Sequence, residues 1–292
     1  MFYSPLRYPG GKGKLASFME YMIDQSGHRG GTYIEAFAGG AGVAIDLLLR
    51  DVVSLIVIND YDKGVWSFWK AILTETDRFV ERLHTVPLTM DEWERQREIC
   101  HVKKDKYSFE LGFATFYMNR TNRSGIIKGG VIGGQEQSGK WRMDARFNRD
   151  ELILRIKNIE RHKATIKLYN KDINSFITNY IPKYEENAIA FFDPPYVRKG
   201  KQLYMNYFNL EDHMRIEEAI REQVKCDWII TYDNAPELKY IYKKHPLYLY
   251  DLNYSVFSKR KASELVIFSD NLKAPNDKKL QEAGIKINLR SC

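Results

Sequence analysis

The sequence predicts an α/β fold, in which helices cover both faces of a mainly parallel sheet and a helical domain is inserted into it. Three observations indicate this arrangement. Short apolar runs rich in β-branched and aromatic residues recur along the 292-residue chain. Helical patterns lie between most of these runs, and alternating strands and helices are typical of a parallel sheet. One stretch, from about 63 to 164, breaks this alternation and is interpreted as the insert.

The apolar runs favour strands because β-branched and aromatic residues pack well on a pleated surface. In chain order, the predicted strands are TYIEAF (32–37), LIVIN (55–59), TIKLY (165–169), AIAFF (188–192), WIITY (228–232), YLYDLNYSVF (248–257) and ELVIF (264–268). Helical patterns between them include VAIDLLLR (43–50) and LEDHMRIEEAIREQV (210–224). Residues 1–62 and 165–292 are therefore expected to form one domain, interrupted by residues 63–164.

The predicted insert is helical at both ends. It opens with the patterns VWSFWKAILTETDRFVERL (65–83), DEWERQREIC (91–100) and FATFYM (113–118), and it closes with LILRIKNIERH (152–162). Trp66 and Trp69 belong to an apolar stripe that is predicted to be core. Between the helical patterns lies a glycine-rich, basic segment, 119–149, which is predicted to be a hairpin.

Composition narrows the function classes. The chain carries 45 basic and 38 acidic residues, a net charge of +7. On charge alone, a polyanionic partner such as nucleic acid and a generically basic surface are about equally compatible with this balance. Three widely separated cysteines argue against a zinc site and fit a reducing compartment. The beginning of the chain lacks an apolar signal core, and no apolar run is long enough to span a bilayer, so a cytoplasmic protein is expected.

A glycine loop follows the first predicted strand. The loop, AGGAG (38–42), leads directly into a helical pattern, and glycines there permit close backbone approach to a ligand. Asp60 lies 18 residues beyond Gly42, near the spacing of an acid that binds a ribose hydroxyl. The dinucleotide and phosphate-loop motifs are both missing from the sequence, so a nucleoside cofactor without polyphosphate is favoured over a purely structural turn. Glu35, beside the loop, is either a ligand for a positive group or a half-buried strand residue.

The heptapeptide FFDPPYV (191–197) ends an apolar run with an acid, two prolines and a tyrosine. Ligands bind where the strands of open α/β sheets end. The Asp193 carboxylate and the Pro194 carbonyl are suited to accept both N–H groups of an exocyclic adenine amine, which would aim the nitrogen lone pair at a methyl donor. Proline stiffens that carbonyl because its ring fixes φ. Tyr196 offers a stacking face for a base that must first leave the duplex.

Four motifs occur in a fixed order: RYPGGK (7–12), EAFAGGAG (35–42), IVIND (56–60) and FFDPPY (191–196). Together they resemble the Dam-type, SAM-dependent DNA adenine-N6 methyltransferases of bacteria and phages, over residues 1 to about 270. The resemblance implies a Rossmann-like class I SAM-dependent methyltransferase fold with an inserted target-recognition domain. It also implies S-adenosyl-L-methionine as cofactor, double-stranded DNA as partner, no obligate protein partner, and methyl transfer to the N6 amine of a flipped adenine.

The resemblance also assigns site residues, position by position. Cofactor contacts are implied for the N-terminal motif, the glycine loop, the acid after the second strand and the motif YNKDI (169–173): Tyr8, Lys12, Glu35, Phe37, Gly39, Asp60, Asp172, Ile173 and Asp193. The target base would be held by Asp193, Pro194, Pro195 and Tyr196. Tyr8 stands where close relatives commonly have a tryptophan. Residues 197–209 are a candidate lid over the base.

The segment 119–149 is the candidate DNA-binding hairpin. It holds seven basic and two acidic residues and six glycines, a composition that suits phosphate contacts but also suits a solvated loop. Its arginines are candidates to read guanine edges, and Asn122 or Gln135 an adenine. The basic loop SKRKAS (258–263) is a second candidate. The predicted DNA-binding residues are Arg120, Asn122, Arg123, Lys128, Lys140, Trp141, Arg142, Lys259 and Arg260.

A second departure from the family pattern and two rival functions remain. The chain has NRSGIIKGG where better-known relatives carry a phenylalanine-asparagine-glycine run, so its target sequence stays open. A methyltransferase acting on RNA or on cytosine-N4 is one rival, although cytosine-N4 enzymes usually carry serine in place of Asp193. A catalytically silent DNA-binding subunit is the other, and the intact glycine loop and DPPY motif count against it. Methyl transfer from a sulfonium requires no metal, only alignment and electrostatics.

Overall fold

The computed structural model describes residues 3–7, 13–102, 105–196, 208–253 and 261–292. Its strands form one sheet in the order β3-β2-β1-β4-β5-β7-β6-β8. Pairing is parallel from β3 through β5 and antiparallel from β5 to β8. The strand bounds are β1 Thr32–Glu35, β2 Leu55–Asn59, β3 Ile166–Tyr169, β4 Ala188–Phe192, β5 Asp227–Asp233, β6 Leu247–Asn253, β7 Lys261–Phe268 and β8 Leu289–Ser291. The predicted α/β class with a mainly parallel sheet is confirmed.

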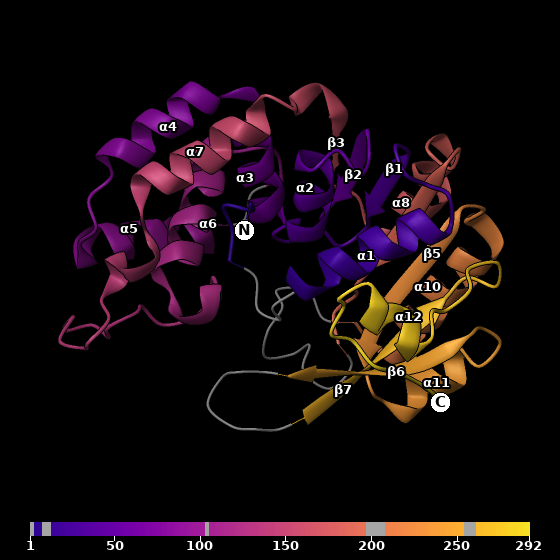
Figure 1. Cartoon of the computed structure of the whole chain (residues 1–292). Coiled ribbons are helices and arrows are strands. Elements are labelled where there is room, and N and C mark those ends of the chain that lie inside the picture. Colours follow the sequence, from indigo (N-terminus) through magenta and orange to yellow (C-terminus); the bar gives the residue numbers. More distant parts are fainter. Residues whose placement is uncertain (1–2, 8–12, 103–104, 197–207, 254–260) are drawn as a thin grey trace.

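Helices cover the sheet on both faces, as Figure 1 shows. Successive side chains of a strand point to opposite faces of the sheet. In β1, Tyr33 belongs to one apolar cluster and Ile34 to the other, and both are fully buried, so each face needs a cover of helices. The helices around the sheet are α1 (Gly13–Gln25), α2 (Gly42–Leu49), α8 (Ile173–Asn179), α10 (Leu210–Gln223), α11 (Pro236–Ile241) and α12 (Asp277–Glu282). Buried residues of α1, α2 and α12 belong to the first cluster, and those of α8, α10 and α11 to the second.

The residues of the predicted insert form a group of helices beside the sheet (Figure 1). These helices, called the helical region below, are α3 (Lys63–Thr74), α4 (Thr76–Thr85), α5 (Met90–His101), α6 (Phe109–Thr121) and α7 (Arg149–Glu160). An aromatic centre holds them together: the Phe68 ring stacks on Phe116 at 5.7 Å, and Phe79 packs edge-on against both. Their buried side chains join the same cluster as one face of the sheet.

The segment 119–149 differs from the predicted hairpin. It contains the end of α6, two short 3₁₀ turns (Arg123–Gly125 and Met143–Arg146) and a single antiparallel bridge between Asn122 and Val131. Ser124, Gly125, Gly133 and Gly134 have positive φ angles, which suit turns and interrupt a regular strand pair. The segment is therefore a turn-rich loop. In the described part of the chain, no helix is long and apolar enough to cross a membrane.

Candidate active site

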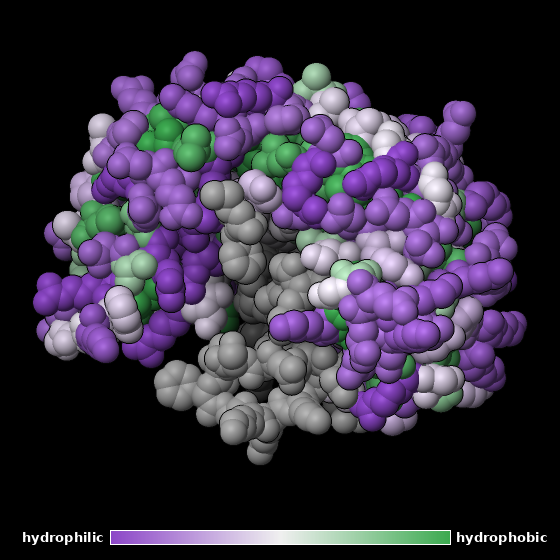
Figure 2. Space-filling view, viewed as in Figure 1, coloured by the Kyte–Doolittle hydropathy of each residue, from purple (hydrophilic) through white to green (hydrophobic). Residues whose placement is uncertain are grey.

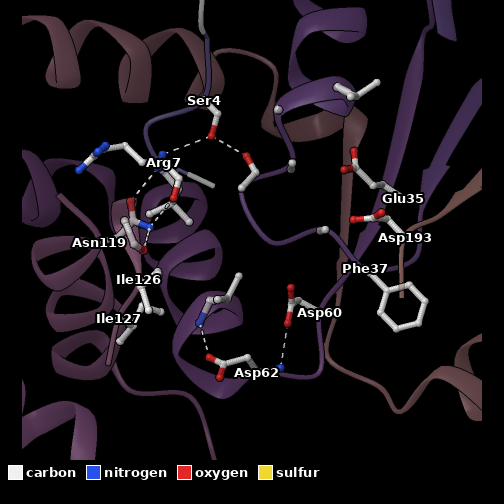
Figure 3. Close-up of a pocket in the computed structure, with 18 of the residues that line it drawn as sticks. Ser4, Arg7, Glu35, Phe37, Asp60, Asp62, Asn119, Ile126, Ile127 and Asp193 are labelled. Carbon is white, nitrogen blue, oxygen red and sulfur yellow. Dashed lines mark hydrogen bonds between the residues drawn. The ribbon is translucent and has the colours of Figure 1, made fainter. Parts of the chain in front are cut away.

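A cavity of about 1700 Å³ lies at the carboxyl ends of the parallel strands (Figure 3). Its sheet side is built from the ends of β1, β2 and β4, the glycine loop and the beginning of α8. Its opposite side is built from α6, the Met143–Arg146 turn and α7, which belong to the helical region. Ligands of open α/β sheets bind at this edge.

The glycine loop is fixed by its own turn and by hydrogen bonds from two side chains. Gly39 and Ala41 have φ angles of 47° and 43°, so the chain makes a left-handed turn between β1 and α2. The indole of Trp69 donates to the Gly39 carbonyl at 2.9 Å, and the Ser4 hydroxyl donates to the Gly40 carbonyl at 2.5 Å. Trp69 is buried as predicted, and it also orients the loop. The loop is thus held before any ligand arrives.

Asp60 lies directly after β2 and points into the cavity (Figure 3). Its Oδ2 accepts the Gly39 amide hydrogen at 2.7 Å, and its Oδ1 accepts that of Asp62 at 2.8 Å. Burial raises the pKa of Asp60 to about 7, and the negative charge of Asp62 contributes to the rise. Each carboxylate oxygen retains lone-pair capacity beyond one hydrogen bond, so Asp60 is suited to accept from ribose hydroxyls.

Glu35 ends β1 with only 4% of its surface exposed. Its Oε2 accepts the Ala44 amide hydrogen at 3.1 Å, in the first turn of α2. That helix begins at Ala41, which offers no capping side chain, so the Glu35 carboxylate supplies the negative charge that a helix N-terminus favours. Glu35 also lines the cavity, where Phe37 packs edge-on against Phe208 at 6.1 Å.

Asp172 and Ile173 begin α8 at the same edge. Asp172 caps the helix by accepting the Ser175 amide hydrogen at 2.9 Å, and both residues line the cavity. The buried Asn59 side chain holds this segment in place, because its Nδ2 donates to the carbonyls of Ala36 and Lys171, both at 3.1 Å. Sequence reasoning missed Asn59, although the motif IVIND contains it.

The DPPY motif follows β4. Asp193 and Pro195 line the cavity, whereas Pro194 and Tyr196 are not among its lining residues. Thr231, on the neighbouring strand β5, donates its hydroxyl hydrogen to Asp193 Oδ1 at 2.7 Å. This bond limits rotation of the carboxyl group, which Figure 3 shows pointing into the cavity. Pro194 and Pro195 are buried, whereas Asp193 and Tyr196 are partly exposed. The arrangement presents a fixed carboxylate next to a rigid turn. Sequence reasoning also missed Thr231.

The predicted DNA-binding residues of the described chain fall into two groups. Arg123, Lys128, Lys140 and Arg142 are exposed, and Trp141 is 66% exposed beneath the Lys140 ammonium. Among these, Lys128 also lines the cavity. The other group is buried and consists of Arg120, at 8% exposure, and Asn122, which is fully buried.

Asn122 does not fit the predicted contact with a base. Its Oδ1 accepts the indole hydrogen of Trp93 at 2.7 Å, and its Nδ2 donates to the carbonyls of Ile126 and Ile127. Both donors and the acceptor of the amide are therefore used inside the protein, where the side chain holds the beginning of the turn-rich loop. Gln135, the alternative base reader, is exposed.

Several predicted residues lie outside the part that the structure describes: Tyr8, Lys12, Lys259, Arg260 and residues 197–207 of the candidate lid. Within the described ranges, the structure brings Glu35, Phe37, Asp60, Asp172, Ile173 and Asp193 to one cavity. The same ranges hold no group of three or more His, Cys, Asp or Glu side chains arranged to bind a metal ion.

One family model matches most of the chain, and several solved structures are similar to it at low sequence identity. The family model described as D12 class N6 adenine-specific DNA methyltransferase matches residues 8–256. Similar solved structures include a putative RNA methyltransferase from Pyrococcus horikoshii (11% identity, 90% of this chain and 87% of that chain, TM-score 0.42). A putative class I S-adenosylmethionine-dependent methyltransferase from Listeria monocytogenes (9% identity, 90% and 62%, TM-score 0.39) is another. No curated protein matches the chain.

Proposed function

The chain belongs to the D12 class of N6 adenine-specific DNA methyltransferases, and from this premise we propose that it methylates the N6 amine of an adenine flipped out of duplex DNA. The sheet, with β7 inserted antiparallel between β5 and β6, has the strand order of the class I SAM-dependent methyltransferases. S-adenosyl-L-methionine is the cofactor of this family. When bound, it supplies an electrophilic methyl group on a sulfonium.

The residues at the sheet side of the cavity suit this cofactor. Asp60 presents carboxylate oxygens at the end of β2, where ribose hydroxyls would donate to them. Asp172 and Ile173 offer an acceptor and an apolar side chain for the adenine ring. Glu35 offers a negative charge for the ammonium group. Hydrogen bonds to its carbonyls fix the glycine loop, and its glycines allow a ligand to lie close against the backbone.

The observation that carries the proposed reaction is that Asp193 and Pro195 of the DPPY turn line the same cavity as the glycine loop and Asp60. The lone pair of an adenine amine is delocalised into the ring, which makes the amine a poor nucleophile. The Asp193 carboxylate and the Pro194 carbonyl would accept its two N–H groups and favour a tetrahedral nitrogen. Thr231 would keep the carboxylate in that orientation. Proximity and orientation then lower the barrier.

The proposed substrate is duplex DNA. Acting on it requires that the enzyme expose the adenine amine and hold the phosphate backbone. Inside a duplex, N6 is paired, so the base has to leave the stack. The exposed cations of the turn-rich loop, Lys140 and Arg142 among them, supply sequence-independent phosphate contacts. Residues 63–164 would then act as the target-recognition domain, and an enzyme acting on bacterial or phage DNA would work in the cytoplasm.

The direct test incubates the protein with labelled S-adenosyl-L-methionine and mixed-sequence duplex DNA, RNA or no nucleic acid, followed by digestion to nucleosides. We expect labelled N6-methyladenine from DNA alone. Label only in RNA, or in N4-methylcytosine, would assign the site to a different methyltransferase reaction. Cofactor binding without any transfer would identify a catalytically silent DNA-binding subunit.

A further inference from the structure

Two asparagines, called the asparagine pair below, tie together the loops that follow β2 and β3. Asn59 is the last residue of β2, and Asn170 is the first residue after β3. Asn59 holds the second loop, because its Oδ1 accepts the Lys171 amide hydrogen at 2.9 Å and its Nδ2 donates to the Lys171 carbonyl at 3.1 Å. Asn170 holds the first loop, because its Nδ2 donates to the carbonyls of Asp60 and Tyr61 at 2.7 and 3.0 Å. Each asparagine thus fixes the backbone of the other loop.

The side-chain amides of the asparagine pair are used inside the protein. The second Nδ2 hydrogen of Asn59 is donated to the Ala36 carbonyl at 3.1 Å, and the Asn170 Oδ1 accepts from the Lys63 ammonium. Asn59 is 2% exposed, whereas Asn170 is partly exposed. An amide group has two hydrogens to donate, and both are paired in each of these side chains. The pair is therefore suited to position other groups rather than to donate to a ligand itself.

The two tied loops carry the two acids that are assigned to the adenosine part of the cofactor. Asp60 directly follows Asn59, Asp172 directly follows Lys171, and both acids line the cavity. In that assignment, Asp60 accepts from the ribose hydroxyls and Asp172 accepts from the adenine amine of the same nucleoside. The donors of one nucleoside are a limited distance apart, so the two carboxylates have to be held at a matching distance.

We propose that Asn59 and Asn170 are positioning residues for cofactor recognition, which set the spacing of Asp60 and Asp172 and so make the cavity selective for a purine that carries an amine. This inference rests on the proposed function, because it uses the cofactor contacts assigned there. It gives a role in ligand selectivity to two side chains that donate no hydrogen bond to the ligand.

Preorganisation is the physical basis of this selectivity. A loop that is already held does not have to be ordered when the ligand binds, so the hydrogen bond from the adenine amine contributes its full free energy. If the loops are no longer tied, part of that free energy is spent on ordering Asp172. A ligand without the amine gains no hydrogen bond from Asp172 and loses little. Removing either asparagine should therefore weaken binding of an adenosyl ligand more than binding of an analogue without the amine.

The test compares two unreactive ligands by calorimetry on the full chain: S-adenosylhomocysteine, and S-inosylhomocysteine, in which a carbonyl oxygen replaces the amine. The wild type should bind the adenosyl ligand at least roughly tenfold more tightly, the value of a hydrogen bond to a charged group. Asn170→Ala should lower this ratio of affinities roughly threefold, the cost of ordering one side chain. Asn59→Ala should lower the ratio at least as much. Asn179→Ala is the matched control and should leave the ratio unchanged, because this exposed residue of α8 is not among those that line the cavity.

The ratio of affinities separates a positioning role from a purely structural one. A structural role would lower the melting temperature and weaken both ligands equally, so an unchanged ratio in the folded variants would overturn the proposal. If Asn59→Ala fails to fold, the partly exposed Asn170→Ala carries the test alone. A wild type that binds both ligands equally would remove amine recognition by Asp172, and the proposal with it, while leaving methyl transfer to its own assay. A wild type that binds neither ligand would contradict the proposed function itself.

Discussion

At the scale of single residues, the proposed methyl transfer depends on how firmly Asp193 is held. The residue follows β4, and its carboxyl group accepts a hydrogen bond from Thr231 on β5 at 2.7 Å. A carboxylate that is already oriented does not have to lose rotational freedom when the base arrives. Asp193→Ala should therefore reduce methyl transfer at least roughly a hundredfold, the lower range for a group that acts on the reacting proton. Cofactor binding, measured by calorimetry, should survive at least in part. Retained turnover would contradict the assigned role.

Thr231 tests the same idea from the second strand. Thr231→Val keeps the shape of the side chain and removes the hydroxyl, so Asp193 loses its orienting bond. We expect kcat to fall roughly tenfold, the cost of a hydrogen bond to a charged group, with the KM for the cofactor unchanged. Thr231→Ser restores the hydroxyl and should recover most of kcat. Equal losses in the valine and serine variants would indicate packing rather than orientation.

Asp60 predicts a pH dependence of cofactor binding. Because burial raises its pKa to about 7, the free enzyme loses this negative charge as the pH falls below about 7. A protonated carboxyl accepts hydrogen bonds from ribose hydroxyls less well, so cofactor affinity should fall up to about tenfold for each pH unit below that value. Asp60→Asn should bind the cofactor weakly and without this dependence. Calorimetric titrations of the two proteins from about pH 5 to pH 8 measure the difference.

The same raised pKa has a consequence for stability. The folded protein holds this proton more tightly than the unfolded chain, whose aspartate titrates near 3.9. The stabilisation is therefore present in full below about pH 4 and is lost as the pH rises through about 7. The melting temperature of Asp60→Asn minus that of the wild type should therefore be larger at about pH 8 than at about pH 5. A constant difference in melting temperature would rule out a titrating Asp60.

At the scale of elements, the N-terminal segment connects the two sides of the cavity. Ser4 donates to the Gly40 carbonyl of the glycine loop, and its own carbonyl accepts from Arg155 of α7. Asn119 of α6 holds the segment like a neighbouring strand, because its Oδ1 accepts the Arg7 amide hydrogen and its Nδ2 donates to the Arg7 carbonyl, both at 2.7 Å. The position of the cofactor loop is thus coupled to that of the helical region.

Asn119→Ala should break this connection. The variant leaves the Arg7 amide hydrogen without its acceptor in a place where Asn119 is 2% exposed, so we expect a loss of roughly 1–3 kcal/mol in the free energy of unfolding. The cofactor KM should also rise because the glycine loop loses support. Chemical denaturation and kinetics measure the two effects. Asn158→Ala is the control, because the Asn158 side chain accepts a hydrogen bond from Arg161, just after α7, at 3.4 Å. Equal losses in both variants would contradict the coupling.

Elements were predictable where the pattern is local. The strands β2 and β4 begin and end as expected, because an apolar run bounded by polar residues carries its own signal. Contacts between distant residues leave no such signal. Thr231 lies 38 residues from Asp193, and the Asn59 amide reaches a carbonyl 112 residues away. Asn122 looked like a base reader for the same reason, since the indole that buries its amide belongs to another helix.

At the scale of the whole molecule, charge is divided between the two sides of the cavity. Carboxylates of Glu35, Asp60 and Asp193 gather at the sheet. The opposite side, built from the N-terminal segment and the helical region, is lined by Arg7, Arg120, Arg146 and Arg155. A cofactor with net positive charge and a strand with regular negative charge would each find an opposite surface. Hydrophilic side chains cover most of the visible face of both parts, as Figure 2 shows. The net charge of +7 is consistent with attraction of a polyanion to the protein.

The exposed end of the turn-rich loop should contribute to that attraction at longer range. Lys140 lies over the Trp141 ring at 5.7 Å, and Arg142 is the next cation along the chain. Exposed cations that neutralise phosphates release counterions from DNA, so Arg142→Gln should weaken duplex binding and make its salt slope shallower by about 0.9. Because Arg142 lies outside the cavity lining, kcat at saturating DNA should stay close to the wild-type value. Binding titrations at several salt concentrations, with Arg161→Gln as the control of equal charge change, measure this. A salt slope that Arg142→Gln leaves unchanged would remove the loop from the interface with DNA.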